Sequence, residues 1–160
     1  MQKSLSKDLA NRLREVLLNG KWIANTNLQE QLTSINWKQA TYRIGHLNTI
    51  AQLTFHISYY LRGLVDVFEG GELLIKDQYS FDMPEITSEA DWNHLVQEFL
   101  ITAEKFISEV EKMDDNLLRQ TFVKKEYGSY LRNIEAQIEH SYYHLGQISM
   151  IKKLLVNGQS

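Results

Sequence analysis

Residues 88–113 read SEADWNHLVQEFLITAEKFISEVEKM and decide the fold class of this chain. The large apolar residues recur at alternating steps of four and three, which brings them onto one stripe of an α-helix. Ser88, with Asp91 three residues later, predicts a helix start resembling a capping box, with Asp in place of Glu or Gln. The stripe consists of Trp92, Val96, Phe99, Ala103, Phe106, Val110 and Met113. It indicates a long helix packed nearly parallel or antiparallel to its neighbours.

Three other segments show helical spacing of their apolar residues, at about residues 4–19, 46–69 and 128–156. A short helix is expected around residues 28–32. Strand-like alternation does not persist anywhere, and no repeat or low-complexity tract is present. We therefore predict an all-α protein, a four-helix bundle forming a single domain over residues 1–160.

The connections between these segments refine the topology. A simple up-and-down bundle uses loops of a few residues, but the gaps before residues 46 and 88 are much longer. The second gap contains Pro84, the single proline, and could span the length of a helix in extended form. We therefore expect long crossover connections between helices.

Composition indicates a soluble globular class and excludes several partners. The chain has 17 Lys and Arg against 20 Asp and Glu, with no basic cluster, so we expect no nucleic-acid partner. No apolar run approaches a membrane span and the N-terminus lacks a signal-peptide core, so we expect no membrane association and a cytoplasmic location. Cysteine is absent, which leaves imidazole and carboxylate as the strong metal ligands available.

Three histidines form a candidate metal site. His140 and His144 are four residues apart, so on a helix both rings lie on one face, a turn from each other. His56 lies near the middle of one helical segment, and the pair lies near the middle of the last. The midpoints of two packed helices of similar length lie at similar depth, so the three rings can converge. Three neutral imidazoles leave one coordination position free, as a catalytic metal requires.

Metal-free interpretations of these histidines remain open. An inward-facing His56 alone is more often a hydrogen-bonded core residue, and His140 and His144 could form a solvated face. Without a metal, however, each of three buried imidazoles would need its own hydrogen-bond partners for its ring nitrogens, whereas one ion can bind a nitrogen of all three. The remaining histidines do not fit. His46 is about 15 Å from His56 along a helix, and His94 lies in the first turns of its own segment.

The spacing of the histidines does not indicate which nearby residue would act as a general acid or base. Glu135 and Glu139 lie on the same segment as the histidine pair, and Tyr60 and Tyr143 flank the histidines in sequence. Gln147, one turn beyond His144, could orient a ligand or substrate. Surface charge or aromatic packing explains each of these residues at least as well, so we assign no catalytic residue.

The sequence around the histidines resembles the DinB/YfiT-like superfamily. The resemblance lies in LTFHISYY at residues 53–60 and HSYYHLGQI at residues 140–148. It extends over essentially the whole chain, including YSFD at residues 79–82 and YGSYLRNIE at residues 127–135. Within the superfamily the chain looks close to a Bacteroidetes-type branch of DinB-like proteins.

The resemblance implies a four-helix bundle with crossover topology and a divalent metal, often zinc or nickel. It carries the three metal ligands over to His56, His140 and His144, all of which are present. Some members of the superfamily are S-transferases or isomerases that use a low-molecular-weight thiol, bacillithiol or mycothiol, as co-substrate. Members are often homodimers, so the resemblance also implies a homodimer.

Three functions are compatible with the sequence. The first is a metal-dependent enzyme, a thiol-dependent S-transferase or a hydrolase, acting on an unidentified small molecule. The second is a non-catalytic metal-binding or stress-associated bundle, in which a fourth protein ligand or closed packing fills the free coordination position. The third is an interaction protein that dimerises and whose histidines bind no metal.

Overall fold

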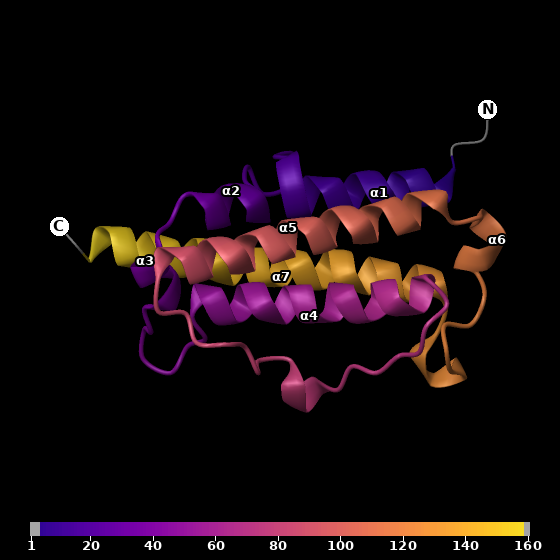
Figure 1. The fold of residues 1–160 in the computed structure, drawn as a ribbon. Coiled ribbons are helices and arrows are strands. Elements are labelled where there is room, and N and C mark those ends of the chain that lie inside the picture. The colour runs from indigo at the N-terminus through magenta and orange to yellow at the C-terminus, as the bar shows by residue number, and fades with distance from the viewer. Residues whose placement is uncertain (1–3, 159–160) are drawn as a thin grey trace.

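The computed structural model describes residues 4–158, which form a bundle of four long helical segments (Figure 1). These segments are α1 (Leu5–Arg14) with a π-helical turn (Glu15–Asn19), α4 (Ile50–Phe68), α5 (Glu89–Lys112) and α7 (Tyr130–Asn157). Short elements fill the connections: α2 (Leu28–Thr33), α3 (Trp37–Thr41), α6 (Asp115–Leu118) and 3-10 turns at Asp77–Tyr79 and Lys125–Tyr127. No β-strand occurs in residues 4–158. The predicted all-α fold class is confirmed.

Helices α4 and α5 run parallel to each other, and α1 and α7 run in the opposite direction (Figure 1). Ion pairs join α4 to α5 between Arg62 and Glu98 at 3.4 Å and between Glu69 and Lys105 at 2.9 Å. Both pairs have a sequence separation of 36 residues, as expected for parallel helices in constant register. The chain must therefore return along the bundle between α4 and α5, and residues 69–88 do so (Figure 1). The predicted crossover is this segment, which we call the crossover strap.

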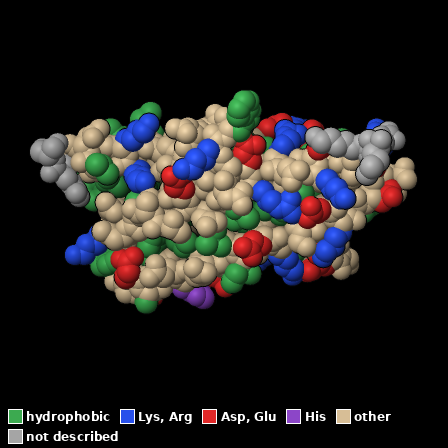
Figure 2. All heavy atoms as spheres, turned by 90° about the horizontal axis from the view of Figure 1, so that it is seen from above, with side chains coloured by type: hydrophobic (Ala, Val, Ile, Leu, Met, Phe, Trp, Pro, Cys, Tyr) green, Lys and Arg blue, Asp and Glu red, His purple; other side chains and the backbone are tan. Residues whose placement is uncertain are grey.

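The core is filled by apolar side chains from all four long segments. Every member of the stripe predicted for residues 88–113 is buried except Met113, which is partly buried just beyond the end of α5. The Trp92 indole N–H donates to the Ile35 carbonyl at 3.1 Å, which ties the connector between α2 and α3 to α5. Figure 2 shows basic and acidic side chains interspersed on the face seen from above. No helix in residues 4–158 combines the length and apolar character needed to cross a membrane.

Several details of the helix assignment differ from the sequence prediction, among them the start of α4 and the presence of α3. Helix α4 begins at Ile50 rather than near His46, because Thr49 and Gln52 form a capping box with hydrogen bonds of 3.1 and 3.0 Å. His46 lies in the loop before the helix. Helix α3 was not predicted, since its five residues are too few to show a hydrophobic period.

The start of α5 follows the prediction in part. The Ser88 hydroxyl accepts a hydrogen bond from the Asp91 N–H at 3.1 Å, as expected of an N-cap. The Asp91 carboxylate, however, accepts from the N–H of Thr87 at 2.9 Å, and so fastens the last residues of the crossover strap to the helix.

The crossover strap docks on α4 through specific contacts. The Tyr59 hydroxyl accepts a hydrogen bond from the Lys76 N–H at 2.8 Å and donates one to the Lys76 carbonyl at 3.0 Å. One turn further along α4, Gly63 leaves room for Ile75, since a Cβ at Gly63 would overlap the Ile75 side chain. These contacts hold the crossover strap against the helix that carries His56.

Candidate metal centre

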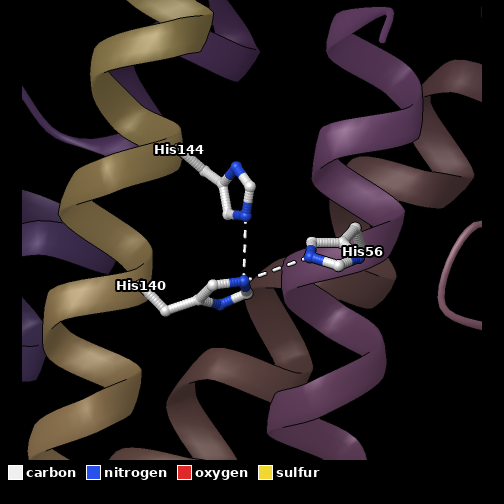
Figure 3. Close-up of side chains that lie close together, drawn as sticks. All are labelled: His56, His140 and His144. Carbon is white, nitrogen blue, oxygen red and sulfur yellow. Dashed lines mark hydrogen bonds between the residues drawn. The ribbon is translucent and has the colours of Figure 1, made fainter. Parts of the chain in front are cut away.

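The structure brings the three predicted histidines together between α4 and α7. The Nε2 atoms of His56 and His140 are 3.1 Å apart, and those of His140 and His144 are 2.8 Å apart. Figure 3 shows the ring of His56, from α4, pointing toward the two rings from α7. The predicted convergence of the rings is therefore present. Their role as metal ligands stays a prediction.

Hydrogen bonding among the rings cannot account for this arrangement. A neutral Nε2 has either one hydrogen or one lone pair in the ring plane, so it forms one good hydrogen bond. His140 Nε2 nevertheless has two nitrogen neighbours, at 3.1 and 2.8 Å. Three imidazole nitrogens within 4.8 Å of one another are instead a donor set that one cation can bind.

The spacing of the nitrogens fits such a cation. With metal–nitrogen distances of about 2.0–2.1 Å, two donor atoms lie about 2.9 Å apart at a right angle and about 3.3 Å apart at the tetrahedral angle. The two Nε2 distances, 3.1 and 2.8 Å, are close to these values. The ligand atoms of all three residues lie within 4.8 Å of one another. The two Nε2 distances are therefore compatible with one divalent metal bound between α4 and α7.

Gln147 selects the tautomer of His144 that a metal requires. His144 Nδ1 lies 2.6 Å from Gln147 Oε1 on the next turn of α7, and an amide oxygen can only accept, so Nδ1 carries the hydrogen. The Nε2 lone pair of His144 is then free to face the other two rings. The Nδ1 atom of His140 is buried and has no hydrogen-bond partner, whereas a hydrogen bond with the Ser80 backbone acts to raise the pKa of His56.

Burial keeps the three imidazoles neutral. It lowers the pKa of His140 from 6.5 to about 4, and the neighbouring rings of His144 and His56 contribute to the same shift. Burial also lowers the pKa of His56, with a smaller contribution from His144. The pKa of His144 is lowered by burial, against the opposing effect of its hydrogen bond to Gln147. Neutral imidazoles at pH 7 are the form that binds metals.

The crossover strap covers one side of the cluster. Its Phe81 ring stacks on His56 with centroids 4.2 Å apart and an interplanar angle of 8°. Tyr60 presents a ring edge to His56 at 5.1 Å and to His140 at 5.4 Å. The Tyr60 hydroxyl donates to Asp77 Oδ1 at 2.7 Å. Burial, followed by this hydrogen bond, raises the pKa of Tyr60 to about 12, so the phenol stays protonated at neutral pH.

Sequence reasoning did not identify Asp77 or Phe81 as neighbours of the site. Both lie in the crossover strap, which has no helical period to indicate the direction of a side chain. The one signal available was the resemblance to DinB-like proteins over residues 79–82, which includes Phe81.

A pocket of about 270 Å³ opens beside the cluster. It is lined by His56, Tyr60, Ala136, Gln137 and His140. The buried Gln137 Oε1 has no hydrogen-bond partner. A small molecule can therefore approach two of the three imidazoles from this side.

The other residues considered as acid or base groups are occupied elsewhere or exposed. Glu135 lies 3.8 Å from Arg12, and Glu139 lies 3.2 Å from Arg132. The Tyr143 ring lies 5.0 Å from the His144 ring but is 65% exposed. Within residues 4–158, no Asp, Glu or further His joins the group formed by the three histidines.

Fold and site together define an all-α bundle with a three-histidine cluster between two antiparallel helices. A family model described as the DinB superfamily matches residues 24–148, a span that includes all three histidines. The chain belongs to the DinB superfamily. No curated protein and no solved structure matched the chain.

Proposed function

We propose that this protein is a metal-dependent enzyme acting on a small molecule, with a divalent metal held by the Nε2 atoms of His56, His140 and His144. The convergence of the three Nε2 atoms carries this proposal, since His140 Nε2 has two nitrogen neighbours and can form only one hydrogen bond. Zinc and nickel are the metals we expect, because the resemblance to DinB-like proteins implies them and imidazole ligands suit both.

An open coordination position supports an enzyme over a closed structural site. Three imidazoles leave at least one position free, and the group contains no fourth His, Asp or Glu within residues 4–158. The pocket beside His56 and His140 gives access from solvent. A divalent cation held there would act as a Lewis acid toward an oxygen or sulfur atom of the substrate.

Residues of this chain have defined roles toward a bound substrate. Tyr60 remains protonated, and its hydroxyl is held by Asp77, so it contributes an oriented phenol rather than a base. Gln137 Oε1 has no partner and can accept a hydrogen bond. Phe81 fixes the plane of His56 by stacking on it. The reaction class we propose is group transfer, with a small thiol as second substrate, or hydrolysis.

Metal analysis of protein purified without a polyhistidine tag tests the site. We expect one divalent metal per chain. Replacing any of the three ligands by Ala should weaken metal binding by more than about 100-fold, since loss of an outer hydrogen-bond partner alone costs about 10–100-fold. Gln147→Leu removes such an outer partner and should weaken metal binding by about 10–100-fold. Matched controls are His46→Ala and His94→Ala, which remove histidines outside the cluster. Metal-free wild type, or equal affinity in ligand and control variants, would contradict the site.

Cobalt-substituted protein tests whether the metal is open to substrate. Addition of a small thiol should change the visible absorption of the cobalt, because the free position accepts the sulfur atom. An unchanged spectrum would favour the non-catalytic metal-binding bundle over an enzyme.

A further inference from the structure

A second pocket lies between α4, α5 and the crossover strap. Its volume is about 250 Å³. The apolar part of its wall is formed by Phe55, Tyr59, Met83, Pro84, Ile86 and Leu95. One water molecule, with a single non-hydrogen atom, occupies about 30 Å³ in the liquid. By that measure the pocket holds a molecule of about eight non-hydrogen atoms. This is the size of a small aromatic or branched aliphatic molecule.

The polar groups around this pocket are mainly acidic. The three carboxylates of Glu85, Asp91 and Glu98 outnumber the basic groups of the wall, which are Arg62 and His94. Arg62 lies 3.4 Å from Glu98. Asp91 also accepts hydrogen bonds from the N–H and hydroxyl of Thr87. Glu85 has no ion-pair partner within the described residues. The excess of carboxylates favours a cationic ligand.

Ser58 adds an unsatisfied polar group to the wall. It is 3% exposed, and its hydroxyl has no hydrogen-bond partner. A buried hydroxyl without a partner is costly, and an ammonium N–H can supply the missing donor. Ser58 lies on α4 one turn from Phe55 and from Arg62, on the face that lines this pocket.

We propose that this pocket binds a small amphipathic amine, with its apolar body between the crossover strap and α5 and its ammonium group among Ser58, Glu85 and Glu98. The site is separate from the histidine cluster, because this pocket and the pocket beside the cluster have no lining residue in common. Phe81 of the strap stacks on His56, whereas Met83, two residues later, lines the amine pocket.

Benzylamine, benzyl alcohol and benzoate, titrated into the full chain at pH 7 and followed by NMR, test the proposal. The three probes have similar aromatic bodies and differ in charge. We expect benzylamine to bind at least tenfold more tightly than either of the others, with the largest shifts at pocket residues. Equal binding of the three probes, or shifts elsewhere only, would overturn the proposal.

Variants separate a ligand role from a structural one. Ser58→Ala removes an unpaired hydroxyl, so we expect unchanged or higher thermal stability and severalfold weaker benzylamine binding. Glu85→Gln should also weaken binding severalfold, whereas Glu72→Gln, an exposed carboxylate of the crossover strap outside the pocket, should not. Unchanged affinity in both pocket variants would overturn the proposal.

A third variant distinguishes this pocket from the metal centre. His144→Ala should retain benzylamine binding, whether or not the three histidines bind a metal. Loss of binding in this variant would show that the amine binds at the cluster instead, and would also overturn the proposal.

Discussion

The two sides of the bundle are built differently. Between α1 and α5 the interior is apolar, with Leu9, Leu13 and Val110 almost completely buried. Between α4 and α7 it contains His56 and His144, which are 9% and 6% exposed. Along this polar side lie buried atoms without a hydrogen-bond partner, from Gln137, His140 and Ser141.

The two sides therefore contribute differently to the stability of the fold. Burial of apolar area stabilises the α1–α5 side, whereas desolvated imidazoles and unpaired polar atoms cost free energy on the α4–α7 side. The crossover strap offsets part of this cost by docking on α4 through Tyr59 and Ile75. A bundle can retain such a polar interior because its other side remains closely packed.

The largest effect on stability is expected on the apolar side. Leu13→Ala should lower the free energy of unfolding by about 2–5 kcal/mol, because it leaves a cavity in a fully buried position. Metal stoichiometry should not change. Chemical denaturation and metal analysis measure the two quantities. The control is Leu154→Ala at a position 48% exposed, for which we expect about 0.5 kcal/mol or less. A similar loss in both variants would contradict the distinction.

Two glycine substitutions test the crossover strap. Gly63→Ala should displace Ile75, loosen the strap over His56 and weaken metal binding by about tenfold, the lower end of what loss of an outer partner costs. Gly146→Ala is the matched control, because its Cβ would meet nothing within 4 Å. That change should raise stability by up to about 1 kcal/mol through helix propensity and leave metal affinity unchanged. Isothermal titration with zinc compares them, and equal affinities would show that the strap does not support the metal centre.

A further test of the polar side concerns the pH dependence of the metal-free protein. The pKa of His140 is about 4 in the folded chain against 6.5 ordinarily, so between these values the unfolded chain binds more protons. The free energy of unfolding should therefore fall as pH decreases from 7 toward 4. Urea denaturation at pH 7 and pH 5 should show a smaller decrease for His140→Gln than for wild type. Parallel decreases would contradict the lowered pKa of His140.

Much of the architecture could be predicted from local patterns. The 4-3 spacing of residues 92–113 predicted the α5 core stripe, and the spacing of His140 and His144 placed both rings on one side of α7. The short helix expected around residues 28–32 is present as α2, but α3 escaped this reasoning because it is shorter than two helical turns. The homodimer, the cytoplasmic location, the small-molecule substrate and the absence of a nucleic-acid partner stay predictions.

By itself the sequence determined the four long helical segments, their inward faces and the positions of the three histidines along them, because periodicity is a local property of the chain. Tertiary structure alone decided what surrounds those histidines. Phe81 lies against His56 and Asp77 against Tyr60 through contacts between a loop and a helix, and no local spacing encodes such pairs. Contacts of this kind depend on where the crossover strap docks on α4. That position is set by Gly63, which leaves space for the Ile75 side chain, and by the Tyr59 hydroxyl, which accepts a hydrogen bond from the Lys76 N–H.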